Sequence, residues 1–87
     1  MMNELFKALG DENRRKILKL LKEGSKNVGE ILSHFDMTGA SLNHHLNSLK
    51  QANLVQSEKK GQNIIYSINI TVFQEVLEWI YDIKGSR

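Results

Sequence analysis

The chain has 87 residues, a formal net charge of +2, and neither cysteine nor proline. This length fits one small domain, and the lack of cysteine excludes disulfides and thiolate metal ligands. No apolar run approaches the ~18 residues of a membrane span, and the N-terminus has no basic block followed by an apolar one. We therefore expect a single cytoplasmic domain over residues 1–87.

The first part of the chain predicts two amphipathic helices. The first helix, over residues 3–9, has an apolar face made of Leu5, Phe6 and Leu9. Gly10 ends this helix, and Asp11 is suited to cap the next one. The second helix closes at Gly24, and its inward residues are Ile17, Leu18, Leu20 and Leu21.

The middle of the chain predicts two further helices joined by a very short turn. Asn27 and Glu30 have the spacing of a capping box at the start of the third helix. The apolar face of that helix consists of Val28, Ile31, Leu32 and Phe35. Asp36 and Met37 form the turn, and Thr38 caps the fourth helix. The inward face of the fourth helix consists of Leu42, Leu46 and Leu49.

The fourth helix has the surface of a DNA-reading helix. The polar residues that lie mostly away from its core side are Ser41, Asn43, His44 and Asn47. No acidic residue occurs from Met37 to Ser57, although the chain carries ten. Because DNA phosphates repel carboxylates, this gap favours a helix that lies against DNA over an ordinary solvated helix face.

After Leu54 the apolar spacing changes from helical to alternating. Ile64, Tyr66 and Ile68 share one face of the second arm, which predicts a β-hairpin. The tip of the hairpin is basic and polar, with the residues Lys59, Lys60, Gly61 and Gln62. Its lysines either contact phosphates or are solvated turn residues, and the winged arrangement favours the former.

The last helix begins at Asn69 or Thr71 and carries more apolar surface than one small domain can cover. A two-fold dimer is the expected arrangement. Its predicted interface residues are Leu5, Phe6, Leu9, Val76, Trp79, Ile80 and Ile83. The element order α-α-α-α-β-β-α predicts a winged helix-turn-helix, mainly α with a small β-hairpin.

The family resemblance begins with the run LFKALGDENRRKIL, which resembles the N-terminal signature of the ArsR family of bacterial repressors. The segment VGEILSHFDMTGASLNHHLNSLKQANLV resembles that family's helix-turn-helix, and GQNIIYSIN resembles part of its wing, the β-hairpin that follows the recognition helix. The ending TVFQEVLEWI is similar to the SdpR-type autorepressor subgroup, and the resemblance covers residues 5–83. It implies a homodimeric repressor whose first and last helices make the dimer. It also implies autorepression that is relieved by sequestration at a membrane protein.

Metal sensing is not expected. Family members that sense metals often have a Cys-x-Cys pair where this chain has Asn27 and Gly29, and others have zinc ligands on a last helix that here lacks histidine. His44 and His45 diverge by about 100° on a helix, which places them poorly for sharing an ion. We expect no metal and no cofactor. Gly39 stands where the family often has a longer polar residue, so the base contact that the resemblance implies at this position does not carry over to this chain.

Together these features predict a non-enzymatic, sequence-specific DNA-binding repressor that binds an inverted repeat as a homodimer. The base readers are Ser41, Asn43 and His44, and the residues that orient the recognition helix are Thr38, Gly39, Ala40 and His45. The predicted phosphate contacts are Lys50, Lys59, Lys60 and Gln62, and His45 is expected to pack at the edge of the helix and to donate to a phosphate. The alternative is a winged-helix module that binds a protein partner instead of DNA.

Arg14 and Arg15 are left out of this set. They lie on the polar side of the second helix, close to several acidic residues. Pairing with Asp11, Glu12 or Glu23 is therefore the simpler interpretation of these arginines.

Overall fold

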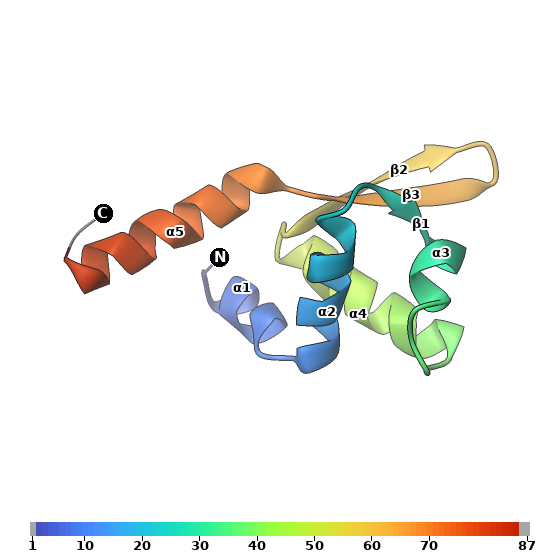
Figure 1. Cartoon of the computed structure of the whole chain (residues 1–87), viewed down its shortest axis with the longest axis horizontal. Coiled ribbons are helices and arrows are strands. Elements are labelled where there is room, and N and C mark those ends of the chain that lie inside the picture. The colour runs from blue at the N-terminus through green and yellow to red at the C-terminus, as the bar shows by residue number, and fades with distance from the viewer. Residues whose placement is uncertain (1, 86–87) are drawn as a thin grey trace.

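The structure is a computed structural model that describes residues 2–85. Figure 1 shows a helical body with a β-hairpin at one end and the last helix projecting from the other. In chain order the elements are α1 (Met2–Leu9), α2 (Glu12–Leu21), β1 (Lys26–Asn27), α3 (Val28–Leu32), α4 (Gly39–Gln51), β2 (Val55–Lys60), β3 (Asn63–Ile68) and α5 (Ile70–Lys84). The predicted fold class, a mainly helical winged helix-turn-helix, is confirmed.

The sheet has three strands in the order β1-β3-β2, one more than the sequence predicts. The additional strand β1 pairs antiparallel with β3, with Lys26 opposite Tyr66 and Asn27 opposite Ile65. A strand of two residues has no alternation of its own, so the order α-α-α-α-β-β-α omitted it. This pairing ties the start of α3 to the hairpin.

Three of the predicted helix caps are confirmed. The Asp11 carboxylate accepts from the backbone N–H of Arg14 at 3.1 Å, at the start of α2. Asn27 and Glu30 form a complete capping box, with reciprocal side-chain to backbone distances of 2.8 and 2.9 Å. The Thr38 hydroxyl accepts from the N–H of Ser41 at 3.1 Å, at the start of α4.

The start of α5 differs from the expectation. Asn69 occupies the N-cap position, but its side chain makes no capping hydrogen bond, and Thr71 lies inside the helix. The Asn69 side-chain amide donates instead to the backbone carbonyl of Asn53 at 3.0 Å. Asn53 has a positive φ of 59° just after α4, so this bond joins the end of α4 to the start of α5.

The hydrophobic core lies between the helices and the base of the sheet. Its fully buried large side chains are Ile17, Ile31, Leu42, Leu46, Leu49 and Leu54. Leu5, which the sequence assigned to the dimer interface, is only 4% exposed and belongs to this core. In contrast, α5 has no buried residue. None of the helices in the described part of the chain is long and apolar enough to cross a membrane.

Candidate nucleic-acid interface

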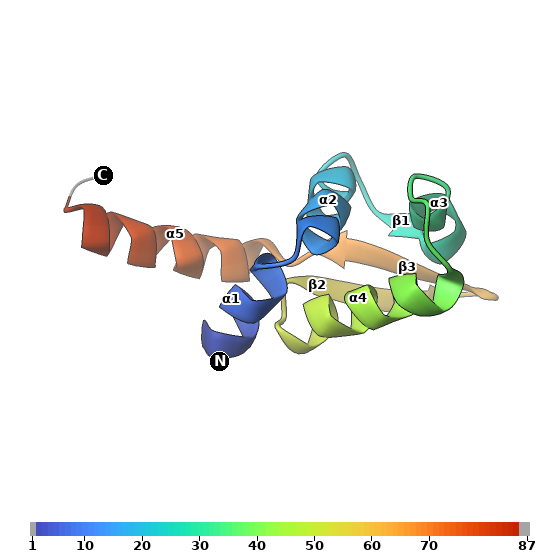
Figure 2. The same cartoon turned by 90° about the horizontal axis from the view of Figure 1, so that it is seen from below.

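The fourth helix, α4, lies along one face of the body (Figure 2). Because its leucines at spacings of four and three fill the core, its opposite side is left to solvent. The exposed residues of this helix include Ala40, Ser41, Asn43, His44 and Asn47. The polar residues that the sequence singled out therefore share one accessible surface, which we call the reading face.

The N-terminus of α4 is open to solvent. The Thr38 hydroxyl accepts from the N–H of Ser41. The N–H groups of Gly39 and Ala40 are therefore the remaining donors of the first turn. Nothing lies within 4 Å of the position that a Cβ on Gly39 would take. The glycine therefore leaves free space at the point where the family resemblance expects a longer side chain.

His45 lies inside the protein, which corrects its expected role as a phosphate donor. Its side chain is 11% exposed, and its Nδ1 lies 3.9 Å from a carboxylate oxygen of Asp11. The same Nδ1 accepts a hydrogen bond from Nε of Arg14 at 3.2 Å. His45 falls on the flank of α4 that faces α2, because it is one helical turn from the buried Leu42 and Leu49.

The arginines of α2 also differ from the expectation of local acid pairing. The Arg14 side chain donates to His45, and only its backbone N–H reaches Asp11. Arg15 donates through Nη1 to the backbone carbonyl of Leu9 at 2.8 Å. Both arginines therefore connect helices to one another through hydrogen bonds, and of the expected acid partners only Asp11 is affected, because the charge of Arg14 lowers its pKa.

The pKa of Asp11 reflects this environment. Burial raises the pKa of Asp11, but the backbone N–H groups of Arg14 and Asn13 together with the charges of His45 and Arg14 outweigh burial, so the pKa of Asp11 lies below its ordinary value. The ionised carboxylate is therefore favoured at the start of α2, where the helix dipole also favours a negative charge.

The hairpin presents its lysines at the end of β2. Lys59 is paired with Ile64 and Lys60 with Asn63, and Gly61 supplies the positive φ of 61° that the tight turn needs. Nζ of Lys60 lies 3.4 Å from the carboxylate of Glu58. Such an exposed pair contributes little to stability and leaves both lysines accessible.

The apolar alternation of β3 describes only the base of the hairpin. Tyr66 is buried, whereas Ile64 is 43% exposed because it lies toward the tip, where the helices no longer cover the sheet (Figure 1).

Lys50 is exposed in the last turn of α4. Of the predicted phosphate contacts, Lys50, Lys59, Lys60 and Gln62 are therefore all on the surface.

The candidate dimer surface is formed by α5 with part of α1. The rings of Phe6 and Trp79 meet with their centroids 5.0 Å apart. Of the predicted interface residues, Phe6, Trp79, Ile80 and Ile83 are exposed, while Leu9 and Val76 are partly buried against the core. Two further apolar residues of α5 are exposed, Ile70 and Leu77. The sequence counts Leu77 among the excess apolar residues of the last helix but misses Ile70, which the helical spacing could have indicated because it continues the stripe of Phe73 and Ile80.

In residues 2–85, no three side chains of His, Asp or Glu lie close enough together to hold a metal ion. His44 and His45 are neighbours, with ring centroids 5.9 Å apart, and their rings are tilted by 57°.

The comparisons with known proteins agree with this architecture. Residues 11–57 match the arsR family of bacterial regulatory proteins. The chain belongs to the ArsR family. Because this family consists of regulatory proteins, the chain is a regulator and not an enzyme.

A relative from Bacillus subtilis (strain 168), the transcriptional repressor SdpR, is 49% identical over 79 residues, which cover 91% of this chain and 88% of the relative. The sequence-based similarity to the SdpR-type subgroup is thereby confirmed. The crystal structure of an ArsR family transcriptional regulator superposes with a TM-score of 0.90 at 28% identity, over 97% of this chain and 87% of that one.

A solution structure from Mycobacterium bovis has a TM-score of 0.78 at 26% identity, over 93% of this chain and 78% of that one. That protein is described as a homodimeric winged helix-turn-helix DNA-binding domain and a possible ArsR-family transcriptional regulator.

Proposed function

We propose that this protein is a transcriptional repressor that binds double-stranded DNA as a homodimer, with α4 in the major groove and the β2–β3 hairpin against the backbone. The observation that carries the proposal is the reading face of α4, which is exposed, polar and free of acidic residues from Met37 to Ser57. A carboxylate on this surface would oppose phosphate binding, whereas amides, hydroxyls and imidazoles hydrogen-bond to base edges.

The reading face supplies the sequence specificity in this proposal. Ser41, Asn43 and His44 are exposed near the N-terminal half of α4, which is the part of a recognition helix that reaches base edges. An asparagine amide can both donate to and accept from adenine, and a serine hydroxyl accepts or donates with any base. The N–H groups of Gly39 and Ala40 lie at the positive end of α4 and suit a phosphate.

The wing and the end of α4 supply affinity that does not depend on sequence. Lys59, Lys60 and Gln62 are exposed at the hairpin, and Lys50 is exposed at the C-terminal turn of α4. Lysines that contact phosphates release counterions and position the protein without reading bases.

The dimer sets the spacing of the two reading faces. Exposed apolar side chains on α5, together with Phe6, form a surface that a second copy would cover. Two helices related by a two-fold axis read an inverted repeat, with half-sites about one turn of DNA apart, on the order of 10 bp. The homodimeric relative from Mycobacterium bovis supports this assembly.

Regulation is proposed to be independent of metal and to take place in the cytoplasm. The name of the SdpR relative supports repression. Autorepression and its relief by a sequestering membrane protein stay predictions of the family resemblance.

The function is tested by selecting bound fragments from genomic DNA and measuring their binding by mobility shift with excess random competitor. We expect an inverted repeat to be enriched and to resist competition. Equal, weak binding to every duplex would contradict the proposal and favour the alternative, a winged helix that binds a protein partner.

A further inference from the structure

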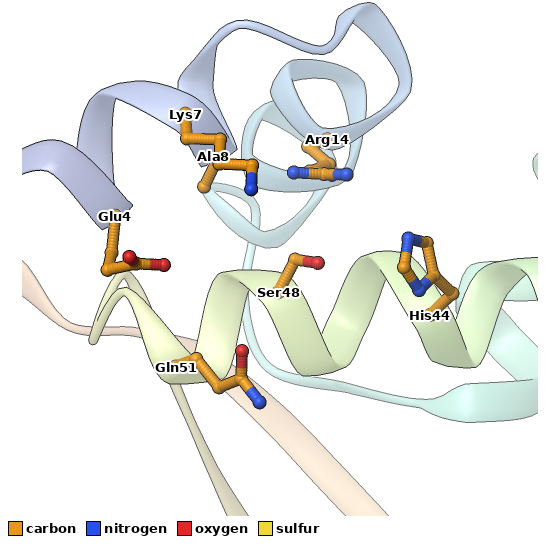
Figure 3. A pocket seen from close by; sticks show the side chains of 7 residues that line it. All are labelled: Glu4, Lys7, Ala8, Arg14, His44, Ser48 and Gln51. Atoms are coloured by element: carbon orange, nitrogen blue, oxygen red, sulfur yellow. The ribbon is translucent and has the colours of Figure 1, made fainter.

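A groove beside the recognition helix gathers polar side chains from three helices. It has a volume of about 270 Å³ and lies between α1, α2 and α4. Figure 3 shows Lys7 and Arg14 on one side, facing the outer side chains of α4 on the other. The polar residues that line the groove are Glu4, Lys7, Arg14, His44, Ser48 and Gln51.

Neither cation of the groove, Lys7 or Arg14, forms an ion pair within the described part of the chain. The charge of Arg14 does act on Asp11, because it contributes to the lowered pKa of that carboxylate. Arg14 uses only its Nε, which donates to His45. The terminal amino groups of a guanidinium form a fork that matches two oxygens of a phosphate, and here they remain available.

His45 gives this guanidinium a fixed direction. Its side chain is buried, and its Nδ1 accepts from Nε of Arg14 at 3.2 Å. An arginine whose Nε is already bonded loses less conformational freedom when it binds an anion. The buried histidine is thus a positioning residue for the groove.

The groove continues the reading face. His44 belongs to both surfaces, and Gln51 lies seven residues farther along α4, which is about 10 Å at 1.5 Å per residue. Ser48 in the groove and Lys50 outside it are two residues apart, so they point about 200° apart around α4. The groove and the predicted phosphate contact Lys50 therefore lie on opposite flanks of the same helix.

We propose that this groove is a phosphate-binding site in which Lys7 and Arg14 hold one oxyanion, with Ser48 and Gln51 as neutral donors. The inference rests on the proposed function and deepens it. A helix in the major groove lies between two DNA backbones. The wing, which is the β2–β3 hairpin, and Lys50 contact one DNA backbone. The groove contacts a phosphodiester of the other DNA backbone. Glu4 opposes this binding, because its carboxylate faces the same space.

The first test is the salt dependence of DNA binding, measured by fluorescence anisotropy with the selected operator duplex. Lys7→Gln and Arg14→Gln should each lower the log–log slope, and the double variant should lower it by about one unit because the two side chains share one phosphate, on operator and random DNA alike. The matched control is Lys19→Gln, which removes the same charge from an exposed position of α2 outside the groove. Lys7→Gln is the decisive variant if Arg14→Gln unfolds, because Lys7 is exposed on the surface of α1.

A second variant removes a negative charge from the groove instead of a positive one. Glu4→Gln should tighten DNA binding because it removes a negative charge from the site, although it slightly lowers thermal stability because Glu4 lies in the first turn of α1. Its control, Glu23→Gln, lies outside the groove in the turn after α2 and should have a smaller effect. Weaker DNA binding by Glu4→Gln would contradict the proposal.

Inorganic phosphate, titrated at constant ionic strength into DNA-free protein, distinguishes the source of the oxyanion. Saturable NMR shifts around residues 4–14 and 44–51 that vanish in Lys7→Gln would assign the site to free phosphate as well as to DNA. Slope changes without such shifts would assign the site to the DNA backbone alone.

Salt-dependence slopes of the groove variants that equal the slope of Lys19→Gln, with no phosphate shifts, would overturn the inference while leaving the repressor function intact. Wild-type protein that binds no DNA would contradict the function instead, and the phosphate titration would still test the groove.

Discussion

Replacement of Ile80 by alanine measures the energy that the dimer gains from the exposed stripe of α5. Ile80 is 45% exposed in the single chain. Complete burial of an isoleucine side chain contributes about 1.5–3 kcal/mol, so covering its exposed part contributes about 1 kcal/mol in each protomer. The two-fold axis doubles this to about 2 kcal/mol per dimer, which corresponds to a roughly 30-fold higher dimer dissociation constant.

Sedimentation velocity over a dilution series gives the dimer dissociation constant directly. Gln74→Ala is the matched control, because Gln74 is an exposed polar residue on the same helix. Ile80→Glu should weaken the dimer further, since it places a charge without a partner in an apolar interface. Operator affinity should fall with dimerisation although every residue of the reading face is retained.

The reasoning is refuted if wild-type protein sediments as a monomer at micromolar concentration and still binds its operator tightly. It is also refuted if Ile80→Ala and Gln74→Ala have equal dissociation constants. Because Ile80 lies outside the core of the protomer, circular dichroism should show the same helical content in both variants.

Four further outcomes are expected. Asn43→Ala or His44→Ala should cost on the order of 1–3 kcal/mol on the operator and much less on random DNA, as measured by competition binding; equal losses would show that they do not read sequence. Replacing Lys59 and Lys60 by alanine should flatten the salt dependence by roughly one to two units of log–log slope, and an unchanged slope would place the wing away from DNA. Asp11→Ala should cost about 1 kcal/mol of stability at neutral pH. Since the pKa of Asp11 is lowered in the folded state, its stabilisation is present above its ordinary pKa and is lost as the pH falls through the folded value, so thermal denaturation of wild type and variant should converge in acid. Isothermal titration should detect no stoichiometric, sub-micromolar zinc binding that alters DNA affinity.

Much of the fold follows from spacing and capping chemistry in the sequence. The leucines of α4 define its buried side, and Asp11, Asn27 and Thr38 mark three helix starts that the structure confirms. These signals are local, so a single sequence contains them in full. The strand β1 is different, because its two residues become a strand only by pairing with β3.

The candidate site was harder to predict wherever tertiary packing decides which way a side chain points. Leu5 and Phe6 are adjacent on one apolar face, yet Leu5 enters the core and Phe6 meets Trp79. His45 looks like its exposed neighbour His44 in the sequence, but the position of α2 determines that it is buried and bonded to Arg14. The groove depends on three helices at once, so no local pattern indicates it.

The contacts of α1 and α2 explain how a dimer surface on α5 can fix the position of the reading face. Phe6 joins α1 to α5 through Trp79, and the buried Leu5 on the same helix anchors α1 in the core. From α2, Arg14 reaches α4 through His45. In the proposed dimer, these contacts are the route from the α5 surface through α1 and α2 to the reading face, and the Phe6–Trp79 contact is its first step, because α5 itself has no buried residue.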